Sequence, residues 1–315
     1  MTLNQTIIRR GRGFTLAELL VAMGITAIIL TLLVTVTGVA LDGWRVSRNK
    51  VRSSRQAKAA LDQFSRDFES MVVRSGNNFE WMYVDSTERE LGPSQNQSPN
   101  AARLIFFSAA TDRYDGNLED PNSRGDVSTV CYDLEFKNPI TGSNADNDEN
   151  QPVFALYRQI VNPDETFGIA GAAGTLAQED LDDAFTPFAI DQFRTNNYLC
   201  ENIYEMSVVF MVEYSEVDGT GRLVTEQRRV PVISTTDDNI VQEFSLRGTG
   251  IHIDDSVEPA ADYGHGRIVS VDISVSVVTD GAMPRLRAGI SGEARDKLLA
   301  ANVYNYAKTI LLPQP

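Results

Sequence analysis

The chain has 315 residues, of which 42% are apolar and 23% are charged, a composition typical of a globular protein with a sizeable core. Its 43 acidic and 28 basic residues give a formal net charge of −15, which argues against nucleic acid as the main partner because phosphate contacts need Lys and Arg. The two cysteines follow no zinc-ligand spacing and form no CxxC pattern.

The N-terminus combines a short basic leader with one long apolar segment. The leader carries Arg9, Arg10 and Arg12, and residues 19–41 then contain no charged side chain. At about 1.5 Å per residue, a helix over this segment spans roughly 35 Å, which is enough to cross the hydrocarbon core of a bilayer. The segment is also longer than the apolar region of a secretory signal, which has about 7–15 residues. The sequence therefore predicts a membrane-spanning helix.

Glu18 stands immediately before this apolar segment. A carboxylate placed fully in hydrocarbon costs about 2.5 kcal/mol or more, so it needs a compensating interaction. One such interaction is a capping box over residues 15–18, in which Thr15 is the N-cap and Glu18 reaches back from the third helical position. An acidic side chain is also favourable at a helix N-terminus.

The stretch RGFTLAELLVA, residues 12–22, resembles the type IV prepilin signature. That signature has a Gly, then Phe-Thr-Leu, a Glu in the fifth place after the Gly, and a long apolar helix. The resemblance implies that a membrane aspartyl peptidase, prepilin peptidase, cleaves after Gly13 and methylates the new N-terminus at Phe14. It also implies that Glu18 pairs with the N-terminal amine of a neighbouring subunit in a filament. Such a pair relieves the cost of two isolated charges in an apolar setting, and a carboxylate has two oxygens to serve both capping and pairing.

The charges that flank the apolar segment bear on which side of the membrane the head lies. Six Lys and Arg residues lie within residues 45–58, against Asp42 alone, whereas the leader has three arginines. The positive-inside rule would therefore keep the C-terminal flank in the cytoplasm. The resemblance implies instead that the head is in the periplasm, and a plain signal-anchor protein that faces the cytoplasm stays as an alternative.

An amphipathic pattern extends the helix beyond the apolar segment. Apolar side chains recur at spacings of three and four at Leu61, Phe64, Phe68, Met71 and Val72. Since residues 14–75 contain no proline, we expect one helix of about 60 residues. A break into two helices near residues 38–43, which include two glycines, stays open. The predicted organisation is a leader over 1–13, a membrane and filament-core helix over 14–42, an amphipathic continuation over 43–76 and a globular head over 77–315.

The head is predicted to be rich in β-strands. In residues 267–279 valine and isoleucine alternate with serine and aspartate, which is typical of a half-buried antiparallel strand. Further strands are expected at residues 103–109, 127–136, 153–161, 203–214 and 222–233. Asp218-Gly219-Thr220-Gly221 predicts a hairpin turn between the last two. Residues 294–312 fit a short helix, and 309–312 equally fit a strand. The fold class is therefore α+β, with an antiparallel sheet on the end of a long N-terminal helix.

Cys131 and Cys200 leave two alternatives, which are two unrelated thiols or one disulfide formed in an oxidising compartment. In residues 130–136 the apolar side chains alternate, and Cys131 falls on the polar face of the expected strand. That is an unusual place for a free thiol, and it slightly favours the disulfide.

The sequence predicts neither an enzyme nor a resident cofactor. His252 and His265 match no metal-ligand spacing, and no GxSxG, P-loop or GxGxxG motif follows a strand and opens a helix. Two acidic loops are weaker candidates for calcium, which prefers carboxylate and carbonyl oxygens, although solvated loops of this kind are commoner. Their acidic residues are Asp146, Asp148 and Glu149 in one loop, and Asp112, Asp115, Glu119 and Asp120 in the other.

The order of elements in the head also resembles the larger minor pseudopilins of type II secretion, the J-type in particular. This resemblance lies in residues 156–161, residues 202–214 and the strand from Val269. The chain also resembles, more faintly, the pilin-like cassette proteins of verrucomicrobia. The implied function is a minor subunit of a type II secretion or type IV pilus-type filament, held in the bacterial inner membrane before assembly. The implied partners are prepilin peptidase, other pilin or pseudopilin subunits, an assembly platform with its ATPase, and membrane lipid. The alternatives are a single-pass anchored binding module that does not polymerise and an anchored enzyme with an unfamiliar site.

Overall fold

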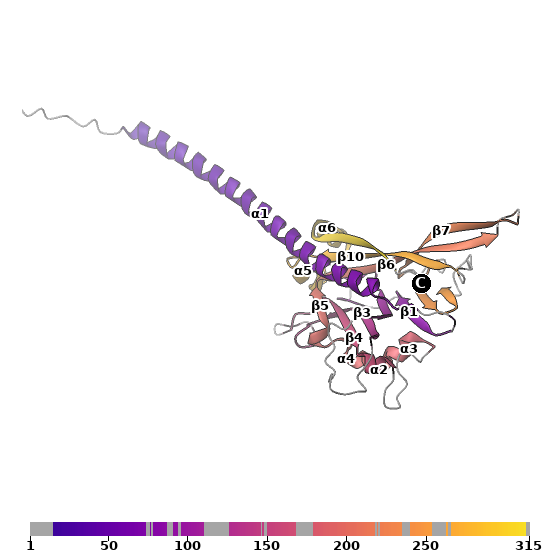
Figure 1. Ribbon diagram of the computed structural model, residues 1–315. Coiled ribbons are helices and arrows are strands. Elements are labelled where there is room, and N and C mark those ends of the chain that lie inside the picture. Colours follow the sequence, from indigo (N-terminus) through magenta and orange to yellow (C-terminus); the bar gives the residue numbers. More distant parts are fainter. Residues whose placement is uncertain are drawn as a thin grey trace, which may run out of the picture. The chain divides into compact units, whose positions relative to one another are not determined.

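A computed structural model (Figure 1) describes residues 15–312 except for 74–75, 77, 87–90, 94–95, 110–125, 146, 148–149, 168–178, 218, 220, 235–239, 254–262 and 264–265. The chain divides into two compact units, residues 1–49 and residues 50–315, and each is considered by itself. Helix α1 begins in the first unit and ends in the second.

Helix α1 covers Leu16–Glu69 without interruption, which confirms a single long helix and contradicts a break near residues 38–43. The helix ends earlier than the expected limit near residue 75. The reason lies in strand β2 (Arg103–Ser108), because the Val72 N–H donates to the Phe107 carbonyl at 2.9 Å and Met71 pairs with Ser108. The backbone after Glu69 therefore takes its hydrogen bonds from a strand instead of from a further helical turn.

The larger part of the second unit is a seven-stranded antiparallel sheet. Its strand order is β5-β4-β3-β2-β1-β8-β9. Besides β2, the sheet contains β5 (Tyr198–Glu201), β4 (Val153–Val161), β3 (Ser128–Lys137), β1 (Glu80–Asp85), β8 (Glu243–Arg247) and β9 (Gly250–Ile253). The expected strands at 103–109, 127–136 and 153–161 are confirmed as β2, β3 and β4, whereas β1, β5, β8 and β9 were not expected.

A second antiparallel sheet has four strands in the order β11-β10-β6-β7. They are β11 (Val303–Leu311), β10 (Arg267–Val278), β6 (Ile203–Val217) and β7 (Leu223–Val232). Strands β6 and β7 pair as the predicted hairpin. Residues 294–312 contain both the expected helix and the expected strand, since α6 (Gly292–Asn302) leads directly into β11. A short helix, α5 (Met283–Arg287), precedes α6.

The head thus has two antiparallel sheets, where the sequence analysis described one. The reason is burial, because apolar faces of both sheets turn inward and each sheet needs another layer to cover it. The last turns of α1 supply part of that layer (Figure 1). Phe64 packs on Tyr132 of β3 with ring centroids 4.0 Å apart, and Phe68 stacks on Phe106 of β2 at 4.6 Å. The Lys308 ammonium of β11 reaches the Asp62 carboxylate at 3.1 Å.

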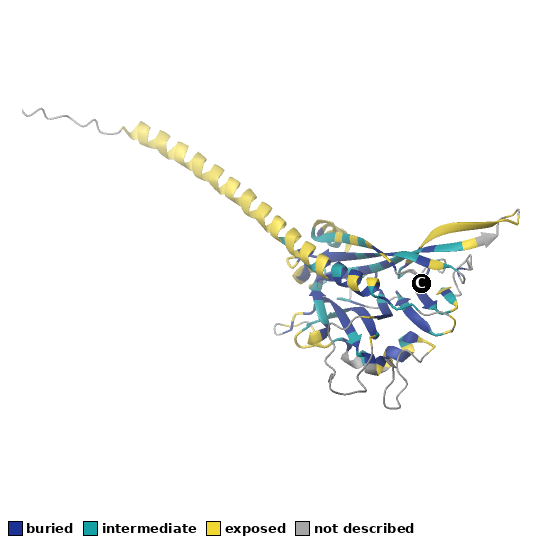
Figure 2. Cartoon of the chain, viewed as in Figure 1, coloured by how far each residue is buried: buried dark blue, intermediate teal, exposed yellow. Residues whose placement is uncertain are grey.

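The opposite face of the seven-stranded sheet is covered by short helices (Figure 1). They are α2 (Pro163–Phe167), α3 (Leu181–Phe185) and α4 (Ala189–Gln192), with single 3-10 turns at Thr186–Phe188 and Thr195–Asn197. Both faces of the central strands are therefore buried, as Figure 2 shows for the head. The observed architecture confirms the α+β class.

Candidate functional site

The first turn of α1 has the predicted capping box. The Thr15 N–H donates to Glu18 Oε2 at 2.9 Å, and the Thr15 hydroxyl donates to the same oxygen at 3.0 Å. In return, the Glu18 N–H donates to Thr15 Oγ1 at 3.2 Å. Among the residues that the structure describes, these bonds occupy Oε2 alone. The second carboxylate oxygen of Glu18 is therefore available to a positively charged partner.

The two residues that flank the predicted cleavage point precede the described part of the chain. Gly13 and Phe14 lie outside the described residues, so cleavage after Gly13 and methylation of Phe14 stay predictions. The structure begins one residue later, at Thr15, which is already part of the cap.

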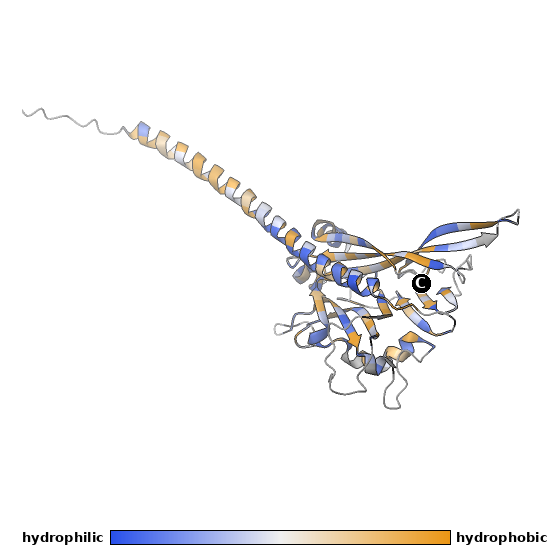
Figure 3. Cartoon of the chain, in the orientation of Figure 1, coloured by the Kyte–Doolittle hydropathy of each residue, from blue (hydrophilic) through white to orange (hydrophobic). Residues whose placement is uncertain are grey.

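The first half of α1 exposes apolar side chains all round. Leu20, Ile29 and Val39 are 60%, 57% and 70% exposed, and none of the most apolar part of the helix is buried. Figures 2 and 3 show the same segment as exposed and hydrophobic. The helix is long and apolar enough to cross a membrane. An apolar surface of this size needs lipid or other protein to cover it.

The polar side chains within this apolar segment are satisfied by the helix itself. Each of four threonine hydroxyls donates to the carbonyl oxygen four residues earlier, at 2.8–2.9 Å; the threonines are Thr26, Thr31, Thr35 and Thr37. Such back-bonding removes the need for water or another chain to accept these protons. The threonines are therefore compatible with a membrane-spanning segment.

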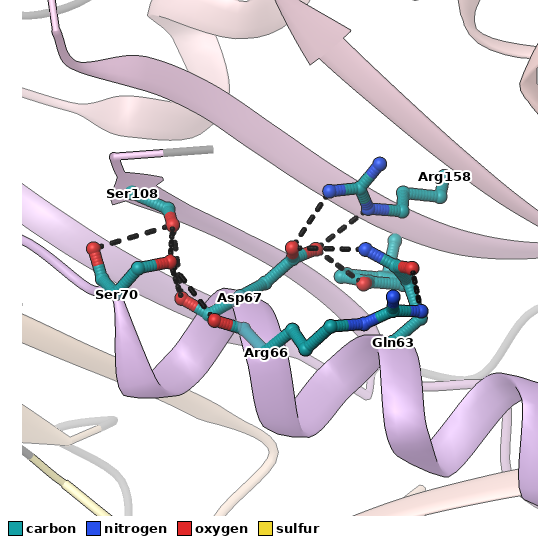
Figure 4. Close-up of polar contacts among 7 residues, drawn as sticks. Gln63, Arg66, Asp67, Ser70, Ser108 and Arg158 are labelled. Carbon is teal, nitrogen blue, oxygen red and sulfur yellow. Dashed lines mark hydrogen bonds and ion pairs between the residues drawn. The ribbon is translucent and has the colours of Figure 1, made fainter. Parts of the chain in front are cut away.

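A buried ion pair fixes the last turns of α1 within the head (Figure 4). The Arg158 guanidinium of β4 binds the Asp67 carboxylate through two bonds of 2.6 Å, Nε to Oδ2 and Nη2 to Oδ1. The Tyr132 hydroxyl donates to Oδ2, and the Gln63 amide donates to Oδ1 at 3.1 Å. The two charged side chains are only 1% and 3% exposed. Burial and the Asp67 carboxylate raise the pKa of Tyr132, so its hydroxyl keeps its proton and donates it.

Two serines extend this network to the end of the helix. The Ser108 hydroxyl of β2 donates to the Asp67 carbonyl at 2.9 Å and lies 2.7 Å from the Ser70 hydroxyl (Figure 4). The Ser70 hydroxyl also donates to the Arg66 carbonyl at 2.9 Å. The Asp67 carbonyl in the last turn of the helix is thereby satisfied by side-chain hydroxyls. Residues 50–69 of α1 are an integral part of the head.

This network was missed from sequence, although a signal was present. Asp67 stands between Phe64 and Met71 at spacings of three and four, on the side of the helix predicted to be apolar. Arg158 stands inside an otherwise apolar predicted strand. Two opposite charges at positions predicted to be buried indicate a pair, because a buried charge needs a counter-charge.

The structure contradicts a disulfide between Cys131 and Cys200, which are free buried thiols. Cys131 pairs with Gln159, and Cys200 pairs with Leu156, so β4 separates their strands and the register places the two thiols on opposite faces of the sheet. The face assigned to Cys131 was correct, but the short helices cover that face. The Gln192 amide of α4 lies 3.1 Å from the Cys131 sulfur.

We expect both thiols to resist alkylation in the folded protein. Burial raises the pKa of Cys131 and of Cys200 to about 12, so the reactive thiolate is scarce at pH 8. Iodoacetamide at pH 8 should label neither cysteine in the native chain and both in denaturant, as read by mass spectrometry. Labelling in denaturant that appeared only after addition of a reductant would reveal a disulfide instead.

The remaining candidates do not form a metal site in the described part of the chain. Calcium candidates Asp146, Asp148 and Glu149 lie outside the described residues, as do all four acidic residues of the other loop and His265. His252 lies on β9, with its Nε2 3.3 Å from the Thr249 hydroxyl. Among the described residues, no three His, Cys, Asp or Glu side chains are grouped so that they could hold a metal ion.

Comparison with known protein families gives a match at the start of the chain. Residues 8–34 match a family model described as the prokaryotic N-terminal methylation motif. The matched residues include Gly13, Phe14 and Glu18 and extend into the exposed apolar half of α1. No curated protein and no solved structure matches the chain.

Proposed function

We propose that this chain, which belongs to the prepilin and pseudopilin family, is a minor subunit of a type II secretion or type IV pilus-type filament. Its methylation motif makes it a prepilin-like protein processed by prepilin peptidase, and its N-terminal apolar helix anchors it in a membrane. We propose further that, before assembly, the protein lies in the bacterial inner membrane with its head in the periplasm.

The exposed apolar half of α1 carries this proposal. No part of the described chain covers it, and its threonines need no outside partner. The same surface can therefore be covered by lipid before assembly and by equivalent helices of other subunits afterwards. A helix of this kind supplies the contacts of a filament core, and the function is assembly rather than catalysis.

Glu18 supplies the register between subunits. Its Oε2 is held by the Thr15 N–H and hydroxyl, which fixes the carboxylate at the exposed start of the helix. After cleavage at Gly13, the amine of Phe14 in a neighbouring subunit would be the positive charge that reaches Oε1. A carboxylate and an ammonium in an apolar helix bundle are each costly alone and stabilise one another as a pair.

The size of the head supports a minor or tip-proximal place. Residues 50–315 form a two-sheet head around the end of α1, with a β6–β7 hairpin whose β7 side chains are mostly exposed. Heads of this bulk pack poorly in a repetitive shaft. We propose a J-like minor pseudopilin of type II secretion as the specific subunit, whose partners would be other pseudopilins and the assembly platform.

We expect the mature protein to begin at Phe14 with a methylated amine. Intact-mass and N-terminal peptide mass spectrometry of the protein from its native cells measures this directly. A Gly13→Val variant, with a branched side chain at the cleavage point, is expected to retain the leader. If the unaltered protein also kept its leader, the chain would instead be an anchored binding module.

A further inference from the structure

Two arginines that follow the apolar segment of α1 are exposed and make their contacts on their own helix. Arg45 lies 3.5 Å from the Asp42 carboxylate, and both side chains are exposed. The Arg48 guanidinium lies over the ring of Trp44. An exposed ion pair between residues three apart contributes little, so it is readily exchanged for another partner. Both arginines are therefore open to an anionic ligand.

Trp44 adds a large aromatic surface beside these charges. Its side chain is 60% exposed, and the Arg48 guanidinium carbon lies 5.5 Å from the centroid of its ring. Residues four apart share one face of a helix, so the ring and the guanidinium are presented together. An indole has an apolar body and a polar N–H, a combination that is enriched at the boundary between hydrocarbon and water.

These residues stand where the helix would leave the hydrocarbon of a bilayer. The run without charged side chains ends at residue 41, and Figure 3 shows α1 turning from hydrophobic to hydrophilic along its length. At about 1.5 Å per residue, Trp44 lies roughly 4.5 Å and Arg48 roughly 10 Å beyond residue 41. The headgroup region on each side of a bilayer is about 5–8 Å thick, and the long stem of an arginine lets its charge reach back toward it.

We propose that Trp44, Arg45 and Arg48 form a binding surface for the headgroups of anionic phospholipids. A guanidinium donates two parallel hydrogen bonds to phosphate oxygens, and basic side chains next to a membrane helix are attracted to a negatively charged lipid surface. The indole of Trp44 fixes the depth of the helix at the same level. The inference depends on the membrane anchor and not on the filament, and it holds on either side of the membrane.

The acidic head of a second copy is the other anionic surface that these arginines could meet, because residues 59–315 have a large excess of Asp and Glu. Trp44 favours lipid, since tryptophan gathers at the membrane–water interface whether or not a protein partner is present. The two occupants are therefore separated by the test.

The test measures which lipid surrounds Trp44 in the full chain reconstituted into vesicles. The vesicles contain equal amounts of phosphatidylglycerol, which is anionic, and phosphatidylcholine, which has no net charge. One of the two lipids at a time is brominated near the headgroup end of its acyl chains. Bromine quenches tryptophan on contact, and the other tryptophan, Trp81, is buried in the core of the head. The ratio of the two quenching efficiencies gives the local lipid composition at Trp44.

We expect phosphatidylglycerol to be enriched about threefold or more at Trp44 at about 0.15 M salt, and the ratio to fall toward one at about 1 M salt. Arg45→Gln combined with Arg48→Gln should bring the ratio close to one. Because each ratio is taken within one variant, any direct effect of Arg48 on the emission of Trp44 cancels.

Arg55→Gln combined with Lys58→Gln is the matched control. It removes the same charge from exposed positions of the same helix, roughly 21 and 26 Å beyond residue 41. That distance exceeds the Debye length of about 8 Å at 0.15 M salt, so the enrichment should remain.

Three results would overturn the inference. Equal quenching by the two lipids in the unaltered chain would show that no anionic headgroup is preferred. An equal loss of enrichment in both double variants would indicate diffuse attraction along the helix. Weak quenching by either lipid, decreasing further as the ratio of protein to lipid rises, would indicate that a second copy covers Trp44 instead.

Discussion

Replacing Arg158 with methionine is expected to lower the free energy of unfolding of the head by about 3–5 kcal/mol. The substitution keeps most of the side-chain volume but leaves the Asp67 carboxylate buried without its counter-charge. Asp67 is held at 2.6 Å by two guanidinium nitrogens, and nothing in its 3% exposed surroundings can replace them. Urea-induced unfolding of the full chain in a non-ionic detergent measures the change.

Two further variants separate burial from charge. Arg229→Met makes the same substitution in an exposed pair, where Arg229 lies 2.9 Å from Asp272 and is 63% exposed, and should cost less than about 1 kcal/mol. Adding Asp67→Asn to Arg158→Met should recover part of the lost stability, because asparagine is neutral and its one carbonyl oxygen can still accept from either Tyr132 or Gln63. Equal effects of the two single arginine variants would show that the buried pair is not the anchor of α1.

Replacing Glu18 with glutamine is expected to reduce incorporation into filaments roughly tenfold or more, while processing at Gly13 continues. Glutamine still accepts the Thr15 N–H as the third residue of a capping box, so the start of the helix is preserved. What is lost is the charge that would meet the amine of the neighbouring subunit, and an unpaired ammonium in an apolar bundle costs more than the 1.4 kcal/mol that equals a factor of ten. The filament fraction recovered by shearing, relative to the membrane fraction, measures this.

Thr15→Ala is the matched variant for the cap. It removes the hydroxyl that bonds Glu18 but leaves the charge of Glu18 intact. We expect a loss of about 1 kcal/mol in local helix stability and near-normal incorporation. If Thr15→Ala impaired incorporation as much as Glu18→Gln, the carboxylate would act through the cap and not through pairing between subunits.

The sequence is most informative where structure is local. The capping box at Thr15 and Glu18 depends on residues three apart, and the structure has the two reciprocal bonds that define it. Strand β4 was placed at its observed bounds, because a run of alternating or continuous apolar residues depends on the strand alone. The length of α1 was overestimated because its end is decided by hydrogen bonds to β2, which is distant in sequence.

Features that depend on long-range pairing could not be predicted. Whether Cys131 is buried depends on α4, which brings Gln192 against it from about 60 positions away in the chain. The short strands β8 and β9 have weak patterns of their own and form where β1 offers an edge.

The four back-bonded threonines of α1 also bear on how a subunit could leave the bilayer. Because each hydroxyl is bonded to its own backbone, exchanging acyl chains for the helices of other subunits breaks no hydrogen bond in this segment. The free energy of this exchange then depends little on how far the helix slides or rotates against its neighbours. The sides of the segment therefore offer little preference for one axial position, and the choice of that position is left to the charged end of the helix.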